Sequence, residues 1–518
     1  MAMLLRARGR FTMGEVWAAC DLAHWRAAWL PGLAVVLALP AAAIAASRGF
    51  DGLYGQDAYA YFDYATASVR GSILQLRPLE PFFWPPGYPL LVALTSMLVG
   101  PSALAGQLVS LLMGALVPML TALLVRELWP EDVSLALLAG AMVALCGQLW
   151  QSSVVVMADT TGLALATLGA VALVRYQRTG SLRWLLLCSA AVAWAILARW
   201  IYGLVATAFV LYALARLRRA RSQLAVGHGV AALAIAAAFL APILGPPLIG
   251  LLRHPAEPAS FAVNLQVYSW SPLNALRRDF FTADGHLSYA LPNGLYYAIA
   301  PANLAFFGPL LAAWIPIGTW AALWRTTFGS GWLIVAWAVI VYAFHAGAPW
   351  QNFRFTLAYL PPLAVLAALG LTWTARRVTQ SATIVVVVCA AVGLLLAGAG
   401  AVRLIEGFID RKDEDLALAR WVQTQTPSNA RLFSFGPTLT LRHYTSLVTF
   451  DLFDLSPAEV QAIVAARVPD YVLVDESSLD GQWRDQTPAR NFHVLRDQVG
   501  LASVGADGAY TLYRVEPP

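Results

Sequence analysis

Two acidic residues stand where a reaction at a membrane surface could use them. Asp57 lies in the segment Gly-Gln-Asp57-Ala-Tyr-Ala-Tyr61, before an aromatic stretch with the pattern of an amphipathic helix, and Asp159 begins a long apolar stretch. A carboxylate that is partly shielded from water can act as a general base and take a proton from an attacking hydroxyl. Either acid could instead cap the helix that follows it. Asp51 and Asp63 are competitors, and Asp63 is the weaker because it faces away from Asp57 on an ideal helix.

Two arginines interrupt apolar sequence. Arg199 stands in Ala-Arg199-Trp-Ile-Tyr-Gly, and Arg354 stands in Gln-Asn-Phe-Arg354-Phe. A cation at membrane depth is costly unless an acid or a phosphate pairs with it, although a long side chain can also extend to the headgroups. Together with the two acids, the arginines suit group transfer from a phosphorylated lipid: a carboxylate takes a proton and the guanidinium groups hold the phosphate.

Other catalytic or metal-binding patterns are missing from the sequence. The seven histidines show no HxxH or HExxH spacing, and there is no P-loop, GxSxG or kinase signature. The four cysteines, Cys20, Cys146, Cys188 and Cys389, are far apart, so they indicate neither a disulfide framework nor a CxxC metal site.

The elements that must position these residues are membrane helices. Of 518 residues, 59% are hydrophobic and 12% are charged, whereas a soluble protein has about 25% charged residues. This composition excludes a disordered chain and an ordinary cytosolic enzyme, and it predicts a polytopic α-helical membrane protein. Eleven stretches have about the length and apolarity of a span: 27–46, 103–125, 133–150, 155–174, 184–198, 200–215, 224–248, 301–324, 331–348, 355–374 and 381–402.

Arginines in the short connections predict the orientation. An N-terminus inside places 15 arginines in inner segments and eight in outer ones, and it leaves the C-terminus outside. The apolar stretch 86–99 is interpreted as interfacial or re-entrant, because a twelfth span there would put the arginine cluster 216–221 outside. Two long outer loops result, about 47–102 and about 249–300.

The charge pattern divides the chain into two predicted domains. Residues 1–402 have a net charge of +10 and residues 403–518 a net charge of −5. The second unit is expected to be a soluble α/β domain outside the membrane, with helices at 414–425 and from Ser456, and strands at 431–435, 470–474 and 510–515. Because the excess of bases belongs to the membrane part, it reports topology, and no nucleic-acid partner is expected.

The order of the motifs over about residues 25–400 resembles the GT-C superfamily of membrane glycosyltransferases, in the branch of the protein O-mannosyltransferases and the lipid A aminoarabinose transferases. The motifs are Asp57 before a Tyr-Ala-rich helix, Pro85-Pro86-Gly-Tyr88-Pro-Leu, Arg126-Glu-Leu-Trp129, Asp159 at the start of a span, Arg199-Trp-Ile-Tyr202-Gly-Leu, and Arg354-Phe355 before Pro361-Pro362. The chain departs from the family at Ala58, where members often have Glu, and at Trp84, where several have Lys.

This resemblance implies a GT-C-like fold and an inverting transfer of a sugar from a polyprenyl-phosphate donor to a lipid, glycan or protein acceptor. The reaction would take place at the outer face of a bacterial cytoplasmic (inner) membrane, among membrane lipids. Asp57 would act as base, Arg199 and Arg354 would stabilise the departing phosphate, and Asp159 would position the acceptor or help hold a divalent cation.

Tyrosines within these motifs, Tyr61, Tyr88 and Tyr202, are candidate substrate-binding residues. Two other functions remain open at this point. One is a transporter or flippase of lipid-linked substrates, although the spans are almost free of charge and show no inverted repeat. The other is a non-catalytic membrane scaffold, which would keep the fold and tolerate the loss of Asp57.

Overall fold

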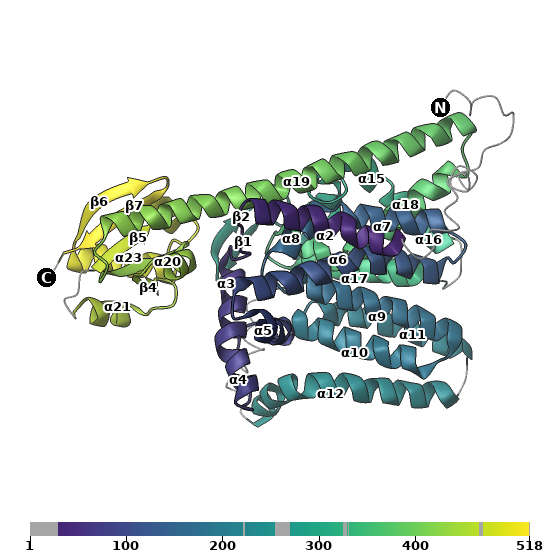
Figure 1. Cartoon of the computed structure of the whole chain (residues 1–518), viewed down its shortest axis with the longest axis horizontal. Helices are drawn as coiled ribbons and strands as arrows, with labels where there is room; N and C mark the ends of the chain where they lie inside the picture. Colours follow the sequence, from purple (N-terminus) through teal and green to yellow (C-terminus); the bar gives the residue numbers. More distant parts are fainter. Residues whose placement is uncertain are drawn as a thin grey trace.

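The computed structural model describes residues 29–220, 223–253, 270–324, 329, 331–465 and 470–516. A bundle of helices forms the larger part of the molecule, and a smaller part with a sheet lies at one end of it (Figure 1). One long helix, α19 (Gln380–Gln425), runs along the bundle and continues to the smaller part (Figure 1). The N-terminal arginines, Cys20 and part of the second predicted outer loop lie outside the described residues.

The bundle is built from two runs of helices. The first run comprises α2 (Trp29–Ser47), α3 (Gln56–Asp63), η1 (Tyr64–Val69), α4 (Arg70–Leu74), α5 (Gly87–Val99), α6 (Ala103–Leu128), α7 (Val133–Ala144), α8 (Gly147–Val154), α9 (Asp159–Thr179), α10 (Leu182–Ala198), α11 (Tyr202–Ala220) and α12 (Gln223–Arg253). The second comprises η2 (Pro272–Leu276), the hairpin β1 (Asp279–Thr282) and β2 (Gly285–Ser288), α14 (Asn293–Ile299), η3 (Ala300–Ala302), α15 (Pro309–Ala312), α16 (Ile315–Trp324), α17 (Gly331–Gly347), η4 (Phe353–Tyr359), α18 (Leu360–Ala375) and α19.

Several of these helices suit a membrane. Among the described residues, five are long and apolar enough to cross one: Trp29–Ser47, Ala103–Leu128, Val226–Pro246, Phe353–Ala375 and the helix Gln380–Gln425. Helices α7 and α8 form a further candidate that is bent by 56°, and shorter apolar helices include α5, α10 and α17. The molecule is therefore mostly helical with several apolar helices, and the total of eleven spans stays a prediction.

Three predicted elements differ in the structure. The expected span 133–150 is broken between α7 and α8, and the expected span 301–324 is divided among η3, α15 and α16. Pro301 and Pro309 each stand in the first turn of a short helix, where the missing N–H of proline does no harm. The helix expected at 414–425 is the end of α19, which is continuous through the predicted boundary at 402/403. Hydropathy detects apolar composition and not a break in the backbone, which explains these differences.

Helix α9 lies between α6 and α10, and small residues allow the close approach. A Cβ on Gly169 of α9 would lie 2.6 Å from Val192 of α10, and one on Gly114 of α6 would lie 3.4 Å from Thr160 of α9. Such small residues let membrane helices pack with their backbones near each other. The packing fixes the first residue of α9, Asp159, beside the residue that follows α10, Arg199.

The C-terminal part contains a five-stranded sheet in the order β4-β3-β5-β7-β6. Its elements are β3 (Arg431–Ser434), α20 (Thr438–Tyr444), β4 (Val448–Asp451), α21 (Pro457–Val464), β5 (Asp470–Val474), α22 (Glu476–Asp480), α23 (Thr487–Val494), η5 (Leu495–Val499), β6 (Leu501–Asp507) and β7 (Tyr510–Val515). Strand β3 is parallel to β4 and β5, whereas β7 is antiparallel to β5 and β6. The strands expected at 431–435, 470–474 and 510–515 are present, and Ser456 and Glu459 form the expected capping box.

The C-terminal part is docked on the segment that carries Asp57. Lys412 of α19, the only lysine of the chain, is buried, pairs with Asp51 and donates to the Tyr444 hydroxyl at 2.8 Å. The Tyr444 hydroxyl also donates to Asp51. Further along, the hydroxyls of Tyr59 and Thr440 are 3.2 Å apart. Residues of the tail thus contact helix α3 and the segment before it. These contacts link the tail physically to Asp57.

We expect a Lys412→Met variant to loosen this link. The loss of charged hydrogen bonds should lower the free energy of unfolding by about 1.5–3 kcal/mol, and amide hydrogen exchange over residues 51–63 should become faster. Arg431→Met is the matched control, because Arg431 forms a mostly buried ion pair with Asp470 at 2.6 Å inside the tail. It should lower stability without changing exchange over 51–63; equal exchange in the two variants would contradict the link.

Candidate active site

Asp57 is placed in the first turn of α3, and its carboxylate does not cap that helix. The N-cap residue is Gly55, whose φ of +77° favours glycine, and no side-chain capping bond is present there. Instead, Oδ2 of Asp57 accepts a hydrogen bond from Nη2 of Arg354 at 2.7 Å. Arg354 is 297 residues away in the sequence, in the first turn of η4. The structure therefore does not show Asp57 acting as a helix cap.

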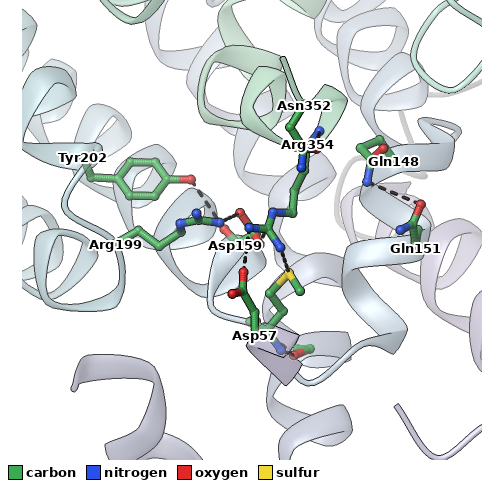
Figure 2. Close-up of polar contacts among 10 residues, drawn as sticks. Asp57, Gln148, Gln151, Asp159, Arg199, Tyr202, Asn352 and Arg354 are labelled. Atoms are coloured by element: carbon green, nitrogen blue, oxygen red, sulfur yellow. Dashed lines mark hydrogen bonds and ion pairs between the residues drawn. The ribbon is translucent and has the colours of Figure 1, made fainter. Parts of the chain in front are cut away.

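Asp159 is the buried centre of the cluster. Its Oδ1 pairs with Nη1 of Arg199, and its Oδ2 lies 3.7 Å from Nε of Arg354. The side chain of Asp159 is 6% exposed, against 25% for Asp57. Figure 2 shows Asp159 between the two guanidinium groups, with Asp57 on the far side of Arg354. The four residues predicted from the sequence are thus brought together as a chain of alternating charges from α3, η4, α9 and α10.

Several buried polar atoms around this cluster lack a hydrogen-bond partner among the described residues, although two of them, Oδ2 of Asp159 and Nε of Arg354, face each other as an ion pair at 3.7 Å. Within the part of the chain that the structure describes, Oδ2 of Asp159, Nε of Arg354 and the hydroxyls of Thr160, Thr161 and Thr356 make no hydrogen bond. Buried polar groups are normally satisfied, so a concentration of unpaired donors and acceptors is unusual. Their proximity to two arginines is what a site for a ligand with several oxygen atoms would require.

Tyr202 supports the cluster from behind. Its hydroxyl donates to the backbone carbonyl of Asp159 at 3.4 Å, and its ring packs so closely on Gly162 that a Cβ there would lie 2.2 Å from a ring carbon. Figure 2 shows the ring reaching toward the start of α9. The ring of Phe355 lies about equally far from both arginines, 6.0 Å from Arg199 and 5.9 Å from Arg354. Both aromatic residues therefore restrict where the charged groups can lie.

Tyr61 and Tyr88 are placed differently from each other. Tyr61, on α3, is buried against Trp84 and Tyr88, and burial raises the pKa of its phenol, so it remains a hydrogen-bond donor. The hydroxyl of Tyr88 instead lies 2.9 Å from the hydroxyl of Ser110 and 3.1 Å from the carbonyl of Gly106. Tyr88 thus packs α5 onto α6, and its hydroxyl is already used. A role of either tyrosine in substrate binding stays a prediction.

The competing acids have other partners. Asp51 pairs with Lys412, and Asp63 lies 3.2 Å from Nε2 of His443 in the tail. Within the part of the chain that the structure describes, neither carboxylate pairs with Arg199 or Arg354. This agrees with the helical argument that placed Asp63 on a different face from Asp57.

Some neighbours of the cluster were missed by the sequence reasoning. Met157 accepts a hydrogen bond from Nη1 of Arg354 at 3.0 Å, and Asn352 caps η4 by accepting from the backbone N–H of Arg354 at 2.9 Å. Gln148 and Gln151, on α8, lie to one side of the arginines (Figure 2). The Asn-x-Arg spacing is a readable capping signal, whereas nothing in the sequence marks Met157, Gln148 or Gln151.

The acids do not fit a divalent cation. Within the described residues, no group of three or more His, Cys, Asp or Glu side chains could hold a metal ion. Asp57 and Asp159 are each paired with arginine, and a cation between them would face the two guanidinium groups. Oxygen ligands for such an ion would have to be free of competing positive charge.

Residues 84–245 match the family described as dolichyl-phosphate-mannose-protein mannosyltransferase, a range that contains Asp159 and Arg199. A search of curated proteins found no match. Among solved structures, ArnT from Cupriavidus metallidurans bound to undecaprenyl phosphate is similar, with 16% identity, a TM-score of 0.58, and coverage of 92% of this chain and 97% of that one.

A second similar structure is the oligosaccharyltransferase AglB from Archaeoglobus fulgidus in complex with an inhibitory peptide and a dolichol-phosphate. Identity is 13%, the TM-score is 0.52, and the match covers 88% of this chain and 70% of that one. At these identities the likeness concerns the fold. Residues 84–245 therefore match that family model over a part of the chain, and the chain shares the fold of the GT-C membrane glycosyltransferases, which confirms the resemblance predicted from its motifs.

Proposed function

We propose that the protein is an inverting glycosyltransferase that moves a sugar from a polyprenyl-phosphate donor to an acceptor at the outer face of a bacterial cytoplasmic membrane. The observation that carries this proposal is the cluster of Asp57, Arg354, Asp159 and Arg199, with unpaired donors and acceptors around it. The structures of relatives with undecaprenyl phosphate and dolichol-phosphate support a lipid phosphate as the donor class.

The exposures of the two acids favour different roles for them. Asp57 is the more exposed acid, so an acceptor hydroxyl can reach its carboxylate. Asp159 is almost fully buried and contacts both arginines, so it positions them for the phosphate. A buried carboxylate that orients cations sets their geometry before the donor arrives, and such preorganisation lowers the barrier for charge that develops in the transition state.

In the proposed reaction, the carboxylate of Asp57 takes the proton of an acceptor hydroxyl. The acceptor oxygen forms a bond to the anomeric carbon from the side opposite the phosphate, and the bond between that carbon and the phosphate oxygen breaks with inversion. Arg199 and Arg354 stabilise the charge on the departing polyprenyl phosphate. If the acceptor is itself a phosphate, no base is required, and Asp57 orients the acceptor through Arg354.

A deletion strain provides the test of this function. Loss of the protein should remove one sugar from an outer lipid, glycan or protein, and the unused polyprenyl-phosphate sugar should accumulate. Mass spectrometry of both fractions identifies the acceptor and the donor together. A plasmid copy of the wild type should restore both, and a strain in which neither fraction changes would contradict the proposal.

The predicted orientation can be tested independently by cysteine labelling. In a variant whose native cysteines are replaced, a membrane-impermeant maleimide should label Ser477→Cys in spheroplasts and Ser222→Cys only after permeabilisation. Ser477 is exposed in α22, and Ser222 lies outside the described residues. Labelling of both positions from the same side would contradict an N-terminus inside and a tail outside.

A further inference from the structure

A large cavity begins at the end of α9 that is remote from the cluster and runs along α10 and α11. It has a volume of about 1160 Å³ and is lined by residues of α9, α10, α11 and α12 and the end of α6. Arg178 in the last turn of α9 lines it, whereas Asp159 is the first residue of that helix. With a rise of about 1.5 Å per residue, roughly 28 Å of helix separates the two. The polar end of the cavity is therefore remote from the candidate active site, although the apolar wall extends to Ile196 and Ala206, three and four residues from Arg199 and Tyr202.

Most of the wall is apolar, and the cavity opens toward the lipid-facing surface. Val210 and Leu214 of α11 are 55% and 51% exposed, and Leu233 of α12 is 72% exposed, although all three line the cavity. None of the residues in the most apolar window of Val226–Pro246 is buried by protein. In a membrane these side chains face acyl chains, so a lipid can enter from the side without crossing water.

One end of the cavity is polar and carries an excess of positive charge. Arg178 and Arg175 both pair with Glu127, at 2.8 Å and 2.5 Å, which leaves one arginine charge uncompensated within this group. Nε2 of Gln177, which lines the cavity, is buried and has no hydrogen-bond partner among the described residues. The hydroxyl of Tyr176 lies 3.2 Å from Nδ1 of His228 at the same end of the cavity. A ligand group that is anionic and accepts hydrogen bonds complements this end of the cavity.

We propose that this cavity binds one anionic phospholipid. The acyl chains occupy the apolar wall between α10, α11 and α12, and the phosphate oxygens accept hydrogen bonds from Gln177 and Arg178. Basic pockets between membrane helices on the cytoplasmic side are a recurring form of recognition for anionic headgroups. In the predicted orientation, Arg178 lies on that side. The bound lipid completes the packing of α12, which otherwise contacts mainly α10.

Native mass spectrometry of the full chain tests the proposal. Protein from nanodiscs of equal parts phosphatidylglycerol and phosphatidylethanolamine should retain one phosphatidylglycerol molecule per chain. Ala236→Trp fills the cavity and should lower that retention at least fivefold. Ala237→Trp is the matched control, because Ala237 is the next residue of α12, is exposed and does not line the cavity; it should retain the lipid.

Substitutions that remove a positive charge test the polar end of the cavity, where we place the headgroup. Arg178→Gln should reduce the preference for phosphatidylglycerol about tenfold, whereas Arg183→Gln, whose guanidinium stacks on Trp184 and does not line the cavity, should not. This pair also decides the matter if Ala236→Trp does not fold. Equal retention of both phospholipids by the wild type, unchanged retention in the cavity variants, or recovery of a polyprenyl phosphate instead would each overturn the proposal. The measurement does not depend on sugar transfer.

Discussion

An Asp57→Asn variant is expected to remain folded and to lose sugar transfer. An amide has nearly the same shape as a carboxylate but cannot take the acceptor proton, and a general base contributes about 100- to 10,000-fold in rate. The donor that accumulates in the deletion strain serves as substrate, and turnover by purified protein is followed by mass spectrometry. The position of the side chain beside Arg354 should be retained, since an amide oxygen still accepts a hydrogen bond.

Asp63→Asn is the matched control for this variant. Asp63 is on the same helix, and its carboxylate faces His443 in the tail instead of the arginines. Its turnover should stay within a few-fold of the wild type. Near-normal turnover by Asp57→Asn would remove Asp57 as the base, and equal losses in both variants would indicate damage to α3 as a whole. If the acceptor is a phosphate, the loss of turnover in Asp57→Asn should be smaller, and Asp57→Glu should not restore the lost turnover.

The second large effect is expected at Arg354. An Arg354→Ala variant should bind undecaprenyl phosphate about 10- to 100-fold more weakly, because hydrogen bonds to charged groups contribute about 1.5–3 kcal/mol. Arg354→Lys should recover part of the affinity, since it keeps the charge but loses the planar donor pair. Binding of undecaprenyl phosphate alone is the measurement, which separates phosphate recognition from catalysis.

Arg278→Ala supplies the control for the lost charge. The side chain of Arg278 is 64% exposed, and its Nε lies 3.6 Å from Oδ2 of Asp279. Arg278 belongs to the second predicted outer loop and is remote in sequence from the cluster. It should leave the affinity unchanged. Because Arg354 also bridges Asp57 and Asp159, thermal unfolding of each variant must be compared with the wild type. Unchanged affinity in a folded Arg354→Ala variant would show that the phosphate does not contact Arg354.

Arg199 and Arg354 could be predicted from the sequence because each interrupts apolar sequence, whereas Asp57 and Asp159 could also have been helix caps and are singled out with the help of the family resemblance. An acid or an arginine inside or beside an apolar span is expensive, so its presence is informative on one sequence alone. Which acid each arginine contacts was not predictable, since Arg354 meets Asp57 across 297 residues. Met157 and the unpaired threonines carry no such signal, because methionine and threonine are ordinary in a membrane helix.

The fold, too, could be predicted from the sequence only in part. Apolar stretches predicted where helices lie, but hydropathy could not find the bend of 56° between α7 and α8, because a window over both helices stays apolar even though α8 contains two glutamines and two serines. The continuity of α19 was missed for the opposite reason. The composition changes sharply near residue 403, yet charged residues such as Glu406 and Arg411 are good helix formers, so the helix does not end there.

This continuous helix determines how the tail meets the rest of the molecule. At about 1.5 Å per residue, its 46 residues measure roughly 69 Å, more than twice the ~30 Å hydrocarbon layer. A rigid rod transmits rotation as well as height: one inserted residue would swing the sheet by about 100°, whereas four would raise it about 6 Å and turn it only about 40°. Insertions between Arg403 and Lys412 should therefore be tolerated only near whole turns, because α20 must return to the same azimuth to meet α3.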